Sequence, residues 1–171
     1  MSRFFPHTAY AEDQPLSHTI LYTHVLTRAI QTGALVGTGV GTTAFLLRLY
    51  NLVKPQLPPS TFANALLRSS GVGAVVAFGM LSVALPMKMW GREEIEWQDR
   101  SWRLLENKGQ LECDDWTYPG MGAGLAVAAA RGGALGWRGA AAGVGLGGLV
   151  GMIGYMGWRN GVKGGKFEEG E

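Results

Sequence analysis

The feature that most limits what this chain can fold into is a series of glycines spaced four residues apart: Gly139, Gly143, Gly147 and Gly151. Residues at positions i and i+4 lie on one side of an α-helix, so the series predicts a helix face without side chains. In water, each interior glycine costs about 1 kcal/mol of helix stability relative to alanine. In a bilayer, such a face lets a second helix approach closely, and close packing drives helix association there. The series therefore predicts a packed membrane helix.

Long uncharged segments separate the charged residues of this chain. Charged residues make up only 16% of the sequence, and they leave uncharged runs at 29–47, 69–87 and 139–158. Each run is close to the roughly 20 residues that cross a hydrocarbon core. The mean hydropathy of +0.08 would by itself suit a soluble glycine-rich protein. Such a protein would, however, have to house all three runs in one core.

A fourth uncharged run, 116–130, is shorter because Arg131 interrupts it. The run can be extended if Arg131 reaches the headgroups or faces protein. We therefore expect an all-α integral membrane protein with four glycine-rich transmembrane helices and a charged helical connector between the second and the third. The expected spans are about 29–47, 62–87, 118–135 and 139–158.

Three polar segments flank or interrupt the expected membrane domain, which covers residues 19–160. They are an N-terminal arm, the charged connector and a C-terminal tail, at residues 1–18, 88–116 and 161–171. Within the connector we expect an exposed helix over about 91–107, broken at Gly109. The third span is expected to begin after Pro119, because proline disrupts a helix interior. From the sequence alone, the helix expected over about 91–107 could equally lie on the membrane, on a partner or in solvent.

Small residues recur at helical spacing in the other spans as well. Such faces let helix backbones approach each other within a bilayer. Together with the glycine series described above, we expect the following residues to pack helix against helix: Gly33, Gly37, Gly41, Gly73, Ala77, Gly120, Gly124 and Ala128.

Tryptophan and arginine mark the expected ends of the spans, where amphipathic side chains favour the headgroup layer. The expected interface anchors are Trp90, Trp116, Arg131, Trp137, Arg138 and Trp158. Arg131 has two readings. It is either a plain interfacial anchor or a contact for an anionic phospholipid such as cardiolipin.

The distribution of charge predicts how the spans are oriented. The loops at 48–60 and 131–138 carry basic residues and no acid, whereas the connector at 88–116 carries more acidic than basic residues. Positively charged loops collect on one side of a membrane, so the two basic loops should lie on the same side. An even number of spans then places both termini on the other side.

No group of residues predicts catalysis, a cofactor or a metal. The GxGxxG pattern at 143–148 lies in the middle of a span, whereas a dinucleotide site needs a strand before it and a soluble helix after it. His18 and His24 lack the spacing of two ligands on a helix, and the acids of the connector alternate with arginines, as on an ion-paired surface. No span is broken or polar enough for a solute site. We expect neither a small-molecule substrate nor a nucleic acid as a partner.

Three motifs follow one another in the second half of the chain: a glycine-rich run with Arg-Gly-Gly at 122–133, then Arg138-Gly-Ala, then the glycine-rich run at 143–148. In this order they resemble the mitochondrial inner-membrane translocase superfamily. That superfamily includes channel-forming preprotein translocase subunits and an accessory subunit of respiratory complex I. The resemblance implies four glycine-rich spans in the mitochondrial inner membrane, with both termini in the intermembrane space.

Two departures from the translocase branch bear on function. The first, second and fourth expected spans contain no Asp or Glu that could guide a basic presequence, and Cys113 is the only cysteine, so no intramolecular disulfide can form. The resemblance therefore implies a non-catalytic accessory subunit that packs against other membrane subunits and stabilises the membrane arm of complex I (NADH:ubiquinone oxidoreductase). The alternative is a subunit of a preprotein translocase or an assembly factor.

Overall fold

The computed structural model describes residues 4–50, 52, 61–131 and 136–165, and this part of the chain is helical, with no strand. It contains one short 3₁₀ helix at Ala11–Asp13 and five α-helices. The α-helices are α1 (Ser17–Leu49), α2 (Phe62–Lys88), α3 (Glu94–Glu106), α4 (Lys108–Ala130) and α5 (Trp137–Gly161). The expectation of an all-α protein is therefore confirmed for the described residues.

Three of these helices, α1, α2 and α5, are long and apolar enough to cross a membrane. Their outer faces expose large apolar side chains, as lipid-facing helices do: Leu35, Val36, Val40, Val76, Met80, Val83, Val150 and Ile153. The third expected span, 118–135, falls on α4, which is not among the helices that are long and apolar enough to cross a membrane. The first half of α4 carries Glu112, Asp114 and Asp115, so its uncharged part is short.

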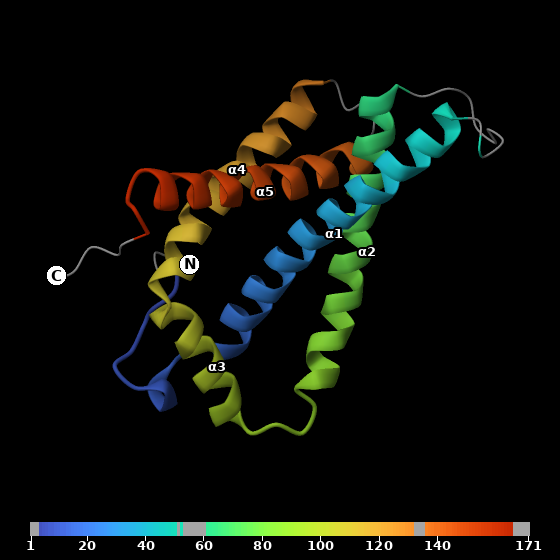
Figure 1. Ribbon diagram of the computed structural model, residues 1–171. Coiled ribbons are helices and arrows are strands. Elements are labelled where there is room, and N and C mark those ends of the chain that lie inside the picture. Colours follow the sequence, from blue (N-terminus) through green and yellow to red (C-terminus); the bar gives the residue numbers. More distant parts are fainter. Residues whose placement is uncertain (1–3, 51, 53–60, 132–135, 166–171) are drawn as a thin grey trace.

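The helices cross in pairs (Figure 1). The first pair is α1 with α2, and the second is α4 with α5; α5 also contacts both α1 and α2. At the common centre, Ala34 and Ala74 are buried against Leu149 of α5. The ends of α1 and α4 and the starts of α2 and α5 lie toward the same end of the array, while α3 lies across the opposite end.

At that opposite end, α3 packs on the protein itself. The indole of Trp97 is buried against Leu21 of α1 and against Leu85 and Met89 at the end of α2. One turn and two turns further along, Ser101 and Leu105 are buried on the same face. The expectation of an exposed helix is therefore wrong for this face, although Ile95 on another face is exposed.

The connector also ends earlier than its charge suggests. The helical conformation is interrupted at Asn107 and not at Gly109. The Asn107 side chain caps the next helix by accepting a hydrogen bond from the backbone N–H of Gln110 at 3.0 Å. From there α4 runs without interruption through Pro119. The predicted start of a helix after Pro119 is therefore wrong. A proline removes one helical hydrogen bond, but α4 continues through Pro119, whose side chain lies at an exposed position of the helix.

The remaining boundaries follow local chemistry. Thr61 caps the start of α2 by accepting a hydrogen bond from the backbone N–H of Asn64 at 3.3 Å. At 33 residues, α1 is about 50 Å long, which exceeds a hydrocarbon core of about 30 Å. The start of α1, before the uncharged run at 29–47, packs against α3. The 161–171 tail lies largely outside the described residues, and so does the 132–135 part of the third expected span.

Candidate functional site

Small residues bring α1 and α2 into backbone contact. A methyl group added at Gly33 would lie under 3.0 Å from the carbonyl oxygen of Gly73 and from the Ala77 side chain. One turn further along, a methyl group at Gly37 would meet the backbone of Ser69 equally closely. The Ser70 hydroxyl then donates a hydrogen bond to the carbonyl oxygen of Ala34 at 3.1 Å, which joins the two helices. Only residues without bulk fit along this contact.

Gly41 extends the same contact by a further turn, since its face meets the side chain of Ser69.

The α4–α5 contact is built in the same way. A methyl group at Gly147 would collide with the carbonyl oxygen of Gly120, and one at Gly124 would collide with that of Gly143. Gly143 in turn faces Ala128. Gly151 lies against the backbone of Trp116, so the contact spans several turns. Gly139, the first glycine of the series, is half-exposed in the first turn of α5.

Two further glycines join the pairs to each other, and the four-residue spacing did not include them. Gly145 faces the Ala34 side chain, and Gly71 faces the backbone of Arg138. As a result, α5 uses one face for α4 and another for α1 and α2. The sequence does show a further glycine, Gly145, between the glycines of the predicted series. The four-residue spacing, however, does not show that α5 packs against a second helix.

The expected interface anchors differ in their surroundings. Trp90 is 85% exposed just after α2, and Trp137 is exposed at the start of α5, where the Arg138 guanidinium lies 5.2 Å from its ring centroid. Arg131 is exposed at the C-terminal end of α4.

Trp116 and Trp158, by contrast, come together, with ring centroids 5.8 Å apart, on α4 and α5. They flank the end of the α4–α5 crossing that lies toward the start of α4 and the end of α5.

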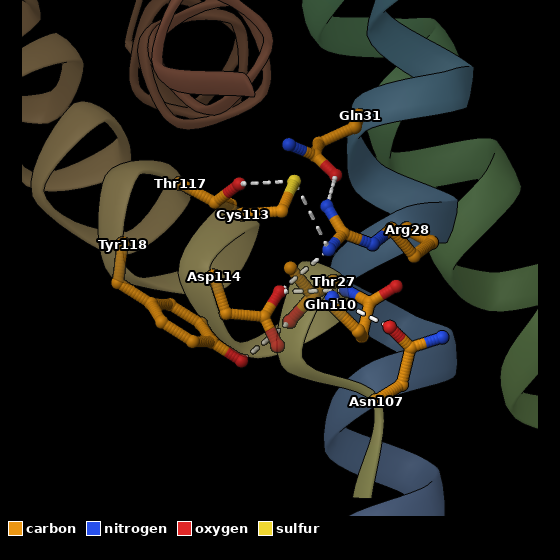
Figure 2. Close-up of polar contacts among 9 residues, drawn as sticks. All are labelled: Thr27, Arg28, Gln31, Asn107, Gln110, Cys113, Asp114, Thr117 and Tyr118. Atoms are coloured by element: carbon orange, nitrogen blue, oxygen red, sulfur yellow. Dashed lines mark hydrogen bonds and ion pairs between the residues drawn. The ribbon is translucent and has the colours of Figure 1, made fainter. Parts of the chain in front are cut away.

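A polar cluster that the sequence did not predict links α1 to α4 (Figure 2). The Arg28 guanidinium donates to the Asp114 carboxylate at 2.5 Å and to the Gln31 side chain at 2.7 Å. Gln110, one turn before Asp114, donates to the same carboxylate oxygen at 3.1 Å. The Cys113 thiol lies 3.7 Å from the same guanidinium. These side chains bridge residues that are 86 positions apart in the sequence.

Burial governs the electrostatics of this cluster. Asp114 is 1% exposed, whereas the Arg28 side chain keeps 23% of its surface. Burial raises the pKa of the Asp114 carboxyl group above its ordinary value, and the Arg28 charge opposes this rise. The second carboxylate oxygen of Asp114 and the Gln31 side-chain nitrogen are buried without a hydrogen-bond partner among the described residues. The ion pair between Asp114 and Arg28 thus holds α4 against α1.

A second ion pair fixes α4 from its other side. The Arg159 guanidinium, near the end of α5, donates to the Glu112 carboxylate at 2.5 Å. Together with Asp114, Glu112 holds the first turns of α4 between α1 and α5.

The N-terminal arm fastens α3 through polar contacts. Glu94 accepts hydrogen bonds from the Ser17 hydroxyl at 2.7 Å and pairs with His18 at 2.8 Å. The Ser17 hydrogen bond, followed by the one with His18, lowers the pKa of the Glu94 carboxyl group. The His18 ring stacks on Trp97 with centroids 3.9 Å apart. Further along, His7 pairs with Glu106 at 2.8 Å, and the Trp102 indole donates to the carbonyl oxygen of Thr8.

The arrangement is suited to holding helices together. In the part of the chain that the structure describes, no three His, Cys, Asp or Glu side chains gather as metal ligands. Of the three histidines, His7 and His18 bind glutamates of α3, and His24 lies half-buried on α1.

Comparison with known proteins assigns the chain to a family. The model of the family described as protein of unknown function (DUF1757) matches residues 8–154. No curated protein and no solved structure matches the chain. Because the match covers most of its length, the chain belongs to the DUF1757 family.

Proposed function

We propose that this member of the DUF1757 family is a non-catalytic structural subunit of a large assembly in the mitochondrial inner membrane, most consistently complex I. It would occupy the membrane as a four-span protein, pack through its glycine faces and stabilise the membrane arm of the complex. The observation that carries this proposal is the construction of both helix pairs around backbone contact. Many large apolar side chains of α1, α2 and α5 point outward.

The packing of α4 supports a fourth span. Its uncharged part, 116–130, is about 22 Å long, somewhat less than a hydrocarbon core. Gly120 and Gly124 nevertheless contact the middle of α5, so α4 would enter the membrane wherever α5 does. Leu125 and Val127 of α4 also expose apolar side chains, which would meet lipid.

The arrangement of loops supports the proposed orientation. Arg48 lies in the last turn of α1 and Arg131 lies at the C-terminal end of α4. These two helix ends lie toward one end of the helical array (Figure 1). In our proposal this end faces the matrix. Both termini and α3 then lie on the intermembrane-space side.

The position of Asp114 supports an accessory subunit over a translocase. A translocase would offer acidic side chains to a basic presequence within its membrane region. Here the Asp114 carboxylate, close to the start of the third expected span, is buried and paired with Arg28, whereas its neighbour Asp115 is half-exposed. The other described acids lie in the arm, in α3 and in the first turns of α4. The alternative function, a translocase subunit or an assembly factor, rests on the resemblance alone.

Two experiments separate these functions. Mitochondrial membranes solubilised in a mild detergent are run on a native gel, where an accessory subunit co-migrates with complex I. In a second experiment the protein is depleted, and both complex I abundance and preprotein import are followed. Loss of complex I with normal import supports our proposal. Loss of import with intact complex I would overturn it in favour of the translocase.

A further inference from the structure

A cavity of about 230 Å³ lies where the start of α1 and the end of α2 meet α3. These two helix ends lie apart, and α3 lies across them (Figure 1). Ala84 brings only a methyl group to the space between them, which leaves part of it open. The wall of the cavity is apolar and consists of Leu21, Val25, Leu81, Ala84, Leu85 and Met89.

Two cationic side chains complete the lining, Lys88 from the last turn of α2 and Arg100 from α3. Among the described residues that line this cavity, none is acidic. Both cations are exposed, and neither forms a hydrogen bond or an ion pair with another residue of the described chain. Two positive charges without a partner therefore border an apolar wall.

The acidic residues nearest to Arg100 lie on its other side. There Arg100 borders a second cavity together with Glu12, Glu96 and Asp99. The carboxylates of Glu96 and Asp99 are each paired with an arginine four residues away, at 3.2 Å and 3.0 Å. Arg100 forms no ion pair with any of the three acids, so its N–H groups are available to a ligand.

The cavity spans the boundary of the proposed membrane region. From Leu81 to Lys88, α2 rises about 10 Å. Trp90, which is 85% exposed, follows directly after the helix. Exposed tryptophan favours the layer of lipid headgroups. In the proposed insertion, the two cations therefore lie at the level of the lipid phosphates, and Leu81 lies within the hydrocarbon.

We infer that this cavity binds one anionic phospholipid. Its phosphate lies between Lys88 and Arg100, and the first part of one acyl chain lies against the apolar wall. The guanidinium presents paired N–H donors that suit phosphate oxygens, and the ammonium group adds a second positive charge. A zwitterionic lipid would bring an ammonium group of its own to these cations, and like charges brought together at a binding site weaken binding.

The inference rests on the proposed insertion into a membrane, but it can fail separately. The purified full-length protein is reconstituted into equimolar phosphatidylcholine, phosphatidylethanolamine, phosphatidylglycerol and oleate. It is then transferred to a mild detergent, and the lipids retained per protein chain are measured by mass spectrometry. We expect phosphatidylglycerol to be retained roughly tenfold over each zwitterionic lipid, which corresponds to about 1.4 kcal/mol.

A pair of charge variants tests the headgroup contact. Lys88→Gln should lower the preference for phosphatidylglycerol roughly threefold, because the two cations share the attraction. Lys108→Gln removes the same charge from an exposed position at the start of α4, outside the cavity, and should leave the preference unchanged. A change in selectivity of this kind is not produced by misfolding.

A pair of size variants tests the acyl-chain contact. Ala84→Phe should fill the cavity and abolish retention of phosphatidylglycerol. Ala63→Phe places the same ring at an exposed position near the start of α2, outside the cavity, and should leave retention unchanged.

Four results would overturn the inference: no retained lipid, equal retention of anionic and zwitterionic phospholipids, retention of oleate in place of a phospholipid, or the same effect of a variant and its control. Each of these would leave membrane insertion intact, because insertion is measured independently by resistance to alkaline extraction.

Discussion

The two ends of this molecule are held together by different physics. Where α1 crosses α2 and α4 crosses α5, backbones touch across glycines such as Gly33 and Gly147, and few side chains take part. Where α3 lies on the start of α1, contact runs through buried large side chains such as Trp97 and Leu105 and through side-chain hydrogen bonds.

This difference matches a difference in solvent. Burying apolar surface stabilises contacts in water, but it offers little within a bilayer, where the surroundings are equally apolar. Close backbone packing retains its value there. We therefore read the glycine-crossed end as the part of the chain within lipid, and the α3 end as the part that meets water.

The largest expected effect comes from breaking the glycine contact. Gly147→Leu cannot be accommodated without separating α4 from α5, because even a methyl group would collide with the Gly120 carbonyl oxygen. Overpacking of this kind costs about 3 kcal/mol or more. The amount of folded protein in the membrane should fall on the order of tenfold, as measured by immunoblotting after membrane isolation.

Gly157→Leu is the matched control, since it places the same side chain on the same helix, where nothing lies within 4 Å. It should accumulate normally. Equal accumulation of both variants would show that the backbone contact does not hold the pair.

The next largest effect concerns the Arg28–Asp114 pair, which lies between the two ends. Asp114→Leu leaves a partly buried guanidinium that cannot lose its charge, so we expect a loss of about 3 kcal/mol in unfolding free energy. Arg28→Met should cost less, because burial already raises the pKa of the Asp114 carboxyl group and the group can take up a proton.

The double variant, Arg28→Met with Asp114→Leu, should recover much of the loss, since an apolar pair can replace a buried ion pair. Unfolding of the four proteins in detergent measures the coupling. Simple addition of the two single effects would argue that the ion pair does not couple α1 to α4.

The smallest effect is expected at the water-facing end. Hydrogen bonds from Ser17 and His18 lower the pKa of the Glu94 carboxyl group below its ordinary value of 4.5. The stabilisation is therefore present above that value and is lost as the pH falls through the lowered pKa. Because Glu94 is exposed, the contribution is less than about 1 kcal/mol.

The protection of α3 amides from hydrogen exchange, measured relative to the intrinsic exchange rate at each pH, should decrease at acidic pH in the wild-type protein. In Glu94→Gln, this protection should already be lower at neutral pH and should change less on acidification. An identical pH response in both proteins would mean that Glu94 does not hold the arm.

The sequence predicted the all-helical architecture, and three of its four expected spans fall on helices that are long and apolar enough to cross a membrane. These elements are predictable because length, charge and glycine spacing are local properties of the chain. The position of α3 was not predictable in this way. Its buried face consists of Trp97, Ser101 and Leu105, and the serine in the middle conceals the apolar pattern.

The contacts of the candidate site can also be divided into those that a local sequence pattern predicts and those that it does not. Four-residue spacing predicts a helix face made of small residues, but it does not identify the opposing helix. The second contact face of α5, at Gly145, was therefore not predicted. The Arg28–Asp114 and Glu112–Arg159 pairs join residues far apart in the sequence, and nothing in their local pattern marks them. Only the crossing of the helices brings these charges together.

The most direct test of this account is extraction of the native membrane with alkaline carbonate, followed by ultracentrifugation. If glycine-lined helix contacts lie within lipid, the protein stays in the pellet together with integral membrane proteins and is released only by detergent. Release of the protein into the supernatant, alongside peripheral proteins, would contradict the account, since the same contacts would then have to hold in water.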